Sequence, residues 1–228
     1  MCGRFYIASE DTAEELRAII ETLQRKTGMQ MKTGEIRPTD ITPAIANNRE
    51  LKPAPFAMKW GFTLPNGKPI INARSETAME KPLFREGMER RRCLIPATLY
   101  YEWEQVGKQK IKNAIKPSGS SVMYMAGVYR FEQGKPVYTI LTKEPAACIR
   151  HIHDRMPVIL PRDICGDWLN LSYHAHDVLK AAVEEVEFRP EANRKHIGSG
   201  SAWYWHCFCR SQYGHRPSAG HTDQRQDA

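Results

Sequence analysis

Cys2 has the most distinctive chemistry for its position in this sequence. It follows Met1, and removal of an initiator methionine before a small residue would leave cysteine at the amino terminus. An α-amine with an ordinary pKa of about 8 and a thiol with one of about 8.5 would then lie on adjacent carbons. Such an aminothiol condenses with an aldehyde to an imine, which the thiol closes to a thiazolidine. The amine can also activate the thiol as a nucleophile. Alternatively, Cys2 is an inert small residue.

Glu102 is a second candidate, because it lies between Tyr101 and Trp103 at the end of an aromatic run. Burial among aromatic side chains raises the pKa of a carboxyl group, which suits a general acid or base. The alternative is an alternating strand in which Glu102 faces water.

His151 and His153 are two residues apart and precede Asp154 and Arg155. In a strand, side chains at this spacing point the same way. Either ring would supply an acid–base group that titrates near neutral pH. The segment offers too few ligands for zinc. The alternative is a solvated polar turn before an apolar strand at residues 157–160.

Asn72 and Arg74 form a fourth polar group. Asparagine supplies both a donor and an acceptor, and arginine supplies a fork that fits phosphate. The alternative is a turn after a short buried strand. Close to the C-terminus, four potential metal ligands match no common zinc-finger spacing; they are His206, Cys207, Cys209 and His215. We therefore predict neither a metal site nor a cofactor.

The elements that must position these residues are mostly strands. Ser9 and the apolar spacing from Leu16 to Leu23 predict an amphipathic helix over residues 10–26. Four runs rich in β-branched, aromatic and aliphatic residues, separated by glycines, then predict short strands at 93–96, 99–103, 122–131 and 137–142. Helices are expected at 161–170 and 175–186, and a last strand at 184–189. This pattern predicts an α+β, mostly β fold: an open barrel or folded antiparallel sheet with flanking helices.

The composition is that of a folded protein with a basic balance. Of 228 residues, 41% are hydrophobic and 26% are charged, which excludes fibrous, collagen-like and wholly disordered chains. Lys plus Arg number 33 and Asp plus Glu 26, so the net charge of +7 favours an anionic partner such as nucleic acid. No membrane-spanning stretch or signal-peptide core is found. We expect a cytoplasmic protein with reduced thiols and no disulfide framework.

The chain is expected to fold as one domain over residues 1–196. Residues 197–228 contain almost no aliphatic side chains and cannot bury enough apolar surface to order themselves. We therefore expect a mobile C-terminal tail over 197–228.

Eight short motifs, taken together and in order, resemble the SRAP family of SOS response-associated peptidases over about residues 2–188. The motifs begin at Cys2, Trp60, Asn72, Cys93, Tyr101, Ala126, Thr139 and His153. The resemblance implies a compact, mostly β fold with a positively charged cleft. It also implies an enzyme that binds single-stranded DNA and links covalently to abasic sites through its N-terminal cysteine. Single-stranded and abasic DNA are the partners it implies, with a monomer, no membrane role, and nucleoid association when DNA is damaged.

The resemblance also implies roles for individual residues. The catalytic set would be Cys2 as nucleophile, Asn72 as a polar positioning residue, Glu102 as the carboxylate and His153 as the acid–base histidine. The DNA contacts would be Arg4, Arg74 and Arg155, with Thr142 lining the same groove. Trp60 and Trp103 are expected either to stack on bases or to support the floor of the cleft.

The expected reaction is formation of a thiazolidine between Cys2 and the aldehyde of an abasic site, after self-processing removes Met1. Two other functions stay open. One is a protease or amidohydrolase with an N-terminal cysteine nucleophile and no role on DNA. The other is a non-catalytic module that binds single-stranded DNA or modified bases, for which the arginines would suffice but which leaves Cys2, Glu102 and His153 unexplained.

Overall fold

The computed structural model describes residues 2–8 and 14–191, and its elements are mostly strands, as expected. The helices are α1 (Glu14–Thr27), α2 (Pro82–Arg90), α3 (Cys165–Leu169) and α4 (Ala175–Leu179), with 3-10 turns η1 (Ala147–Ile149) and η2 (Arg162–Ile164). The strands are β1 (Arg4–Ile7), β2 (Gly34–Ile36), β3 (Ile41–Asn47), β4 (Pro53–Trp60), β5 (Phe62–Thr63), β6 (Pro69–Ile70), β7 (Asn72–Arg74), β8 (Arg92–Ala97), β9 (Leu99–Val106), β10 (Gln109–Pro117), β11 (Met123–Glu132), β12 (Lys135–Lys143), β13 (Met156–Pro157), β14 (Ile159–Leu160) and β15 (Val186–Pro190).

Five strands close into a barrel. They pair in the order β4, β3, β8, β11 and β12, and β12 returns to β4 in parallel, while the other four pairings are antiparallel. Short strands extend this sheet, because β7 pairs with β12 in parallel, β13 pairs with β12 and β14 pairs with β11. The expected mostly β fold is therefore confirmed, with the barrel closed.

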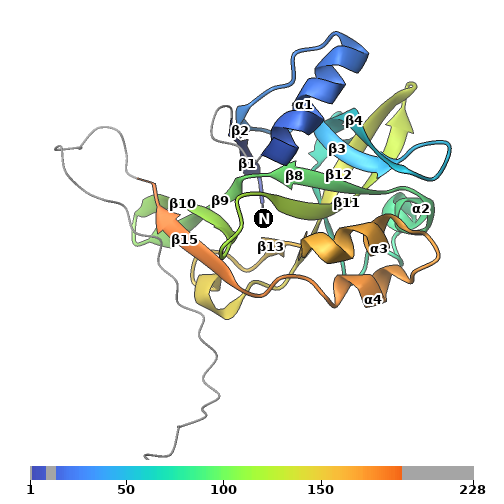
Figure 1. The fold of residues 1–228 in the computed structure, drawn as a ribbon. Coiled ribbons are helices and arrows are strands. Elements are labelled where there is room, and N and C mark those ends of the chain that lie inside the picture. Colours follow the sequence, from blue (N-terminus) through green and yellow to red (C-terminus); the bar gives the residue numbers. More distant parts are fainter. Residues whose placement is uncertain (1, 9–13, 192–228) are drawn as a thin grey trace, which may run out of the picture.

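A second, antiparallel sheet of five strands has the order β15, β10, β9, β1 and β2. Glu102 lies on β9 of this sheet, and Cys2 lies two residues before the start of β1. Figure 1 shows this sheet beside the barrel, with α1 over β3 and β4, and with α2, α3 and α4 grouped at another side.

The core between the sheets is built from large aromatic side chains. Phe5 on β1 lies 5.1 Å from Trp60 on β4, between ring centroids, and Trp60 stacks on Tyr138 of β12 at 6.5 Å. All three are fully buried, and the Trp60 indole N–H donates to the Ile71 carbonyl at 3.0 Å. Of the two expectations for Trp60, base stacking is therefore wrong, because no face of the ring reaches solvent; the ring fills the core between the sheets.

Glycines fix two tight features of the barrel. The β11–β12 hairpin turns at Gln133 and Gly134, both with positive φ (50° and 75°), the conformation that two-residue hairpins require. At Gly127 on β11, a Cβ atom would lie 2.5 Å from the Ile95 side chain and 2.8 Å from the Thr139 carbonyl oxygen. Only glycine lets these strands approach so closely.

The four predicted strands correspond to β8, β9, β11 and β12, and the predicted N-terminal helix to α1, whose expected start at residues 10–13 lies outside the described residues. The helix expected over 175–186 is too long, because α4 ends at Leu179. Beyond α4, the Val183 N–H donates to the Ile159 carbonyl at 2.8 Å instead of continuing a helix. β15 then begins at Val186, near the expected last strand. The boundary expected between domain and tail, at residues 196 and 197, lies outside the described residues.

In the described ranges, no helix combines the length and apolarity that crossing a bilayer requires.

Candidate active site

Cys2 lies in the interior directly before β1. Its side chain is fully buried, and its Sγ lies 3.8 Å from the Arg4 carbonyl oxygen. Burial raises the pKa of the Cys2 thiol far above its usual value, and the nearby negative charge of Glu102 raises it further. The thiol is therefore protonated at neutral pH, and a base must take its proton before the sulfur can attack.

Asn72 holds the main chain of Cys2. Its Nδ2 donates to the Cys2 carbonyl oxygen at 2.9 Å. The Asn72 Oδ1 is buried and has no hydrogen-bond partner within the described part of the chain. Asn72 starts β7, which is anchored in register on β12, with Asn72 opposite Ile140. The barrel thus fixes the amide that positions the residue at the start of the other sheet.

Glu102 is the buried carboxyl of the site. It is 3% exposed on β9. Burial is the largest cause that raises its pKa, to about 7, and the negative charge of Asp154 adds to this, while the positive charge of the chain's amino terminus lowers it. Near neutral pH this carboxyl therefore exists in both forms, and it can accept a proton or donate one.

His153 lies in the loop after η1. Its backbone N–H donates to the Ile149 carbonyl at 3.2 Å, and its Nδ1 accepts from the Arg155 N–H at 3.1 Å. The Asp154 carboxylate lies 2.7 Å from the same Nδ1 and favours a protonated ring. Burial, followed by the positive charge of the amino terminus, nevertheless lowers the His153 pKa below its usual value. The ordinary pKa of histidine is 6.5, so a lowered pKa leaves the His153 ring mostly neutral at pH 7.

His151 and His153 do not share a strand face, contrary to the expected spacing argument. Residues 150–152 form turns after η1, which is the alternative of a polar turn. His151 is exposed, and its ring packs edge-on against Phe188 of β15 at 5.5 Å. Within this segment, the half-buried His153 remains the candidate for the site, and His151 lies at the surface.

The three arginines expected to contact DNA have different surroundings. Arg74 at the end of β7 is exposed. Arg4 forms an ion pair with Glu35 on β2 at 2.8 Å, and its guanidinium lies 5.2 Å from the centre of the Trp103 ring. Arg4 is about one third exposed, so it can still offer N–H groups to a ligand. Trp103 is half-buried beside it, which leaves its expected base-stacking role open.

Arg155 is buried, and its terminal nitrogens form hydrogen bonds within the protein. Both of its terminal nitrogens bind the Glu76 carboxylate, at 2.9 and 2.8 Å, and Nη2 also donates to the Thr142 carbonyl at 2.6 Å. The same Thr142 carbonyl accepts from the N–H and the hydroxyl of Ser75. Thr142 itself is fully buried, with its Oγ1 directed to the Ala73 carbonyl at 3.3 Å. Arg155 thus ties the His153 loop to β12 and to the segment after β7.

Two further residues belong to the site that sequence reasoning did not select. Tyr100 precedes Glu102 by two residues on β9, is fully buried, and interacts electrostatically with Cys2 and Glu102. Asn113 on β10 lies directly opposite Glu102 and is fully buried. The glycine turn at Gly107 could have predicted the β9–β10 hairpin and hence this pairing.

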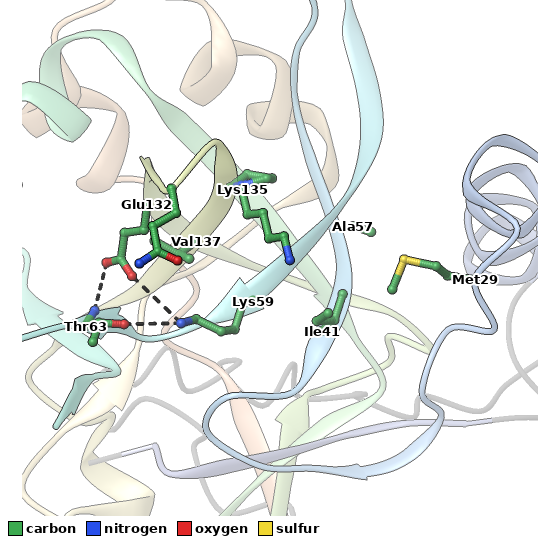
Figure 2. A pocket seen from close by; sticks show the side chains of 10 residues that line it. Met29, Ile41, Ala57, Lys59, Thr63, Glu132, Lys135 and Val137 are labelled. Atoms are coloured by element: carbon green, nitrogen blue, oxygen red, sulfur yellow. Dashed lines mark hydrogen bonds and ion pairs between the residues drawn. The ribbon is translucent and has the colours of Figure 1, made fainter. Parts of the chain in front are cut away.

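The structure also contains a cavity of about 680 Å³, whose lining residues are drawn in Figure 2. It lies between the end of α1 and the β11–β12 turn, and none of the predicted site residues lines it. Lys59 on its wall donates to the Thr63 hydroxyl at 3.2 Å and forms an ion pair with Glu132 at 3.8 Å. The cavity thus shares no residue with the candidate active site around Cys2.

The described ranges contain no group of three His, Cys, Asp or Glu side chains that could hold a metal ion. No disulfide joins the four cysteines that these ranges include, which are Cys2, Cys93, Cys148 and Cys165. The ligand-like cluster at residues 206–215 lies outside them.

Comparison with known proteins shows which family and which fold the chain resembles. A family model described as SOS response associated peptidase (SRAP) matches residues 1–194. Abasic site processing protein YoaM of Bacillus subtilis is 37% identical over 201 residues, covering 80% of this chain and 85% of that protein. Abasic site processing protein HMCES of Xenopus tropicalis is 28% identical over 171 residues, covering 59% of this chain and 51% of that protein. A crystal structure of a Bacteroides thetaiotaomicron protein has the same fold, with a TM-score of 0.70 at 21% identity, over 84% of this chain and 93% of that one.

Proposed function

Because this chain belongs to the SRAP family, we propose that it processes abasic sites in DNA and links to them covalently through Cys2. The observation that carries the proposal is the convergence on Cys2 of Asn72 and Glu102, which come from opposite sheets. Asn72 holds the Cys2 carbonyl at 2.9 Å, and the buried Glu102 carboxyl interacts electrostatically with the Cys2 thiol.

The first step exposes the reactive amine. Hydrolysis of the Met1–Cys2 peptide bond adds the hydroxyl of water to the methionine carbonyl and a proton to the Cys2 nitrogen. Glu102 is the buried group suited to act as the base that takes a proton from this water. Its pKa of about 7 leaves part of it as carboxylate at neutral pH. Asn72 keeps the Cys2 carbonyl in place while the bond on the other side of the residue breaks.

The second step joins protein and DNA. An abasic deoxyribose opens to an aldehyde, the Cys2 amine attacks C1′, and the carbinolamine hydroxyl leaves as water once it has received a proton. His153 and Glu102 are the acid–base groups for these transfers. The sulfur of Cys2 then attacks the imine carbon: the C–S bond forms, the thiol proton passes to Glu102, and the imine electron pair returns to nitrogen, which takes up a proton. The product is a thiazolidine.

Basic residues would supply affinity for the DNA backbone. Arg74 is exposed and Arg4 partly exposed near the start of β1, so both can neutralise phosphates. The buried Arg155 would act differently, by holding the His153 loop through Glu76 and the Thr142 carbonyl. Single-stranded DNA, whose bases are unpaired, is the substrate we propose.

A denaturing gel with an oligonucleotide that carries one abasic site tests this function. Wild-type protein should give a slower band that survives denaturation, and Cys2→Ala should give none while it retains reversible DNA binding. An equal yield of the shifted band from Cys2→Ala would overturn the proposal. Hydrolysis of unrelated peptides by the wild type, without any shifted band, would support the rival protease function instead.

A further inference from the structure

Asn113 is a buried polar residue that the reaction described above does not use. On β10 it pairs directly with Glu102 of β9, so the two side chains project from the same face of the sheet. The Cβ atoms of such cross-strand partners are about 4.5–5.5 Å apart. Asn113 is fully buried and Glu102 is 3% exposed, so both side chains are shielded from solvent.

Only half of the Asn113 amide is engaged. Its Nδ2 donates to the Ile111 carbonyl of the same strand at 3.3 Å. Its Oδ1 is buried and has no hydrogen-bond partner in the ranges that the structure describes. A buried acceptor without a donor is costly, so structures rarely leave one without a reason. The cross-strand neighbour, Glu102, can gain an O–H donor by taking up a proton.

Charged and titratable groups face Glu102 from the other elements packed around it. Cys2 and the amino terminus lie ahead of β1, Tyr100 is on β9 itself, and Asp154 is in the loop after η1. On β10, Lys112 neighbours Asn113 but contacts the Tyr101 ring at 3.6 Å and Glu35 at 2.8 Å, on the opposite face. Among these groups, the neutral Asn113 can discriminate between the two forms of Glu102 through the direction of a hydrogen bond.

We propose that Asn113 is a positioning residue, whose Oδ1 accepts a hydrogen bond from the protonated carboxyl of Glu102. This contact would hold the Glu102 proton in one orientation until the carbinolamine hydroxyl takes it and leaves as water. Glu102 is then a carboxylate and can accept the thiol proton of Cys2. The inference deepens the proposed function and rests on it for the role of Glu102 in the reaction.

The test measures the Glu102 carboxyl directly, without DNA. In full-length protein labelled with ¹³C at the glutamate side-chain carboxyl, the signal that Glu102→Gln removes is followed from pH 4 to 9. Asn113→Leu should lower the titration midpoint by about half a unit or more, because the protonated form loses its acceptor. Leucine cannot solvate the carboxylate form of Glu102, so a change in burial alone would raise the midpoint. An unchanged or raised midpoint would overturn the inference.

Thr139→Val is the matched control, because Thr139 is also fully buried with an Oγ1 lacking a partner in the described ranges, but lies on β12 of the barrel. It should leave the midpoint where it is. If Asn113→Leu does not fold, Asn113→Thr and Asn113→Val replace it, since they have the same shape and only threonine keeps an acceptor. The valine variant should then have the lower midpoint, and equal midpoints would overturn the inference. A wild type that titrates as expected but forms no link to abasic DNA would refute the proposed function alone.

Discussion

The side-chain amide of Asn72 donates a hydrogen bond to the backbone carbonyl of Cys2 at 2.9 Å, across the boundary between the two sheets. This contact fixes the main chain of the nucleophile rather than its sulfur. A barrel residue therefore determines where the amine and thiol of Cys2 lie.

Replacing Asn72 should slow linkage to abasic DNA more than it weakens DNA binding. Asn72→Ala removes one hydrogen bond, worth about 1 kcal/mol, and frees the chain at Cys2, so we expect a loss of tenfold or more in the linkage rate. A time course on denaturing gels measures the rate. Ser75→Ala is the matched control, because it removes a nearby hydrogen bond to Thr142 and none to Cys2. Equal losses in both variants would show that Asn72 acts only through local stability.

Glu102 should make stability depend on pH. Its folded-state pKa of about 7 lies above the ordinary value of 4.5, so the folded state binds the proton more tightly than the unfolded state does. This contribution is fully present below about pH 4.5 and is lost as pH rises through 7. Glu102→Gln has no carboxylate to bury. We therefore expect Tm values equal to those of the wild type near pH 4.5 and higher by several degrees at pH 8. A wild-type protein more stable than the variant at pH 8 would contradict the burial of this carboxylate.

His153 and His151 should behave differently in linkage. His153→Ala should change the rates of linkage and release across pH 5.5 to 8 and have little effect on affinity, because the ring is neutral at pH 7 and attracts phosphate weakly. His151→Ala should change neither, since its ring contacts Phe188 at the surface. Linkage time courses and binding titrations separate the two quantities. An effect confined to His151, or equal for both, would place the acid–base group elsewhere.

We expect Arg74 to contact the DNA backbone and Arg155 to support the fold. For the two phosphate contacts of Arg4 and Arg74, the logarithm of single-strand affinity should fall against the logarithm of salt concentration with a slope of about −1.4, and Arg74→Ala should reduce that slope by about 0.7. Fluorescence anisotropy with a labelled oligonucleotide at several salt concentrations measures it. A slope unchanged by Arg74→Ala would show that this side chain does not meet the backbone.

Arg155→Ala should lower the free energy of unfolding, because it removes three hydrogen bonds that join Glu76, Thr142 and the His153 loop. We expect a loss of about 1–3 kcal/mol, measured by chemical denaturation. Glu76→Gln keeps an acceptor for Arg155 and should cost less. An Arg155→Ala protein as stable as the wild type, with weakened DNA binding, would assign this arginine to the DNA instead.

Local patterns in the sequence predicted much of the fold. The composition of the segments around Cys93, Tyr101 and Ala126 predicted strands. The glycines between them predicted turns, which the structure forms with positive φ. The helix expected at 175–186 was too long, because apolar spacing alone could not reveal that Val183 pairs with Ile159. Closure of the barrel through the parallel β4–β12 pairing joins strands distant in the sequence, which no local pattern records.

The site was harder to predict than the fold. The resemblance to a family selected Cys2, Asn72, Glu102 and His153, and the structure adds contacts between segments that are far apart, such as Asn72 with Cys2. The pairing of Arg155 with Glu76 spans 79 residues and could not be read from either one's neighbours. Asn113 escaped notice because a single asparagine in a strand has no distinguishing pattern until the hairpin register places it opposite Glu102.

The central claim is that Cys2 acts as an N-terminal aminothiol, and intact mass spectrometry tests it most directly. The purified protein should have the mass of the chain without Met1. After incubation with a single-stranded abasic oligonucleotide, a species should form whose mass is the sum of protein and DNA minus one water, stable without chemical reduction, as a thiazolidine requires. Protein that retains Met1 and forms no such species, or an adduct of equal yield on Cys2→Ala, would contradict the account.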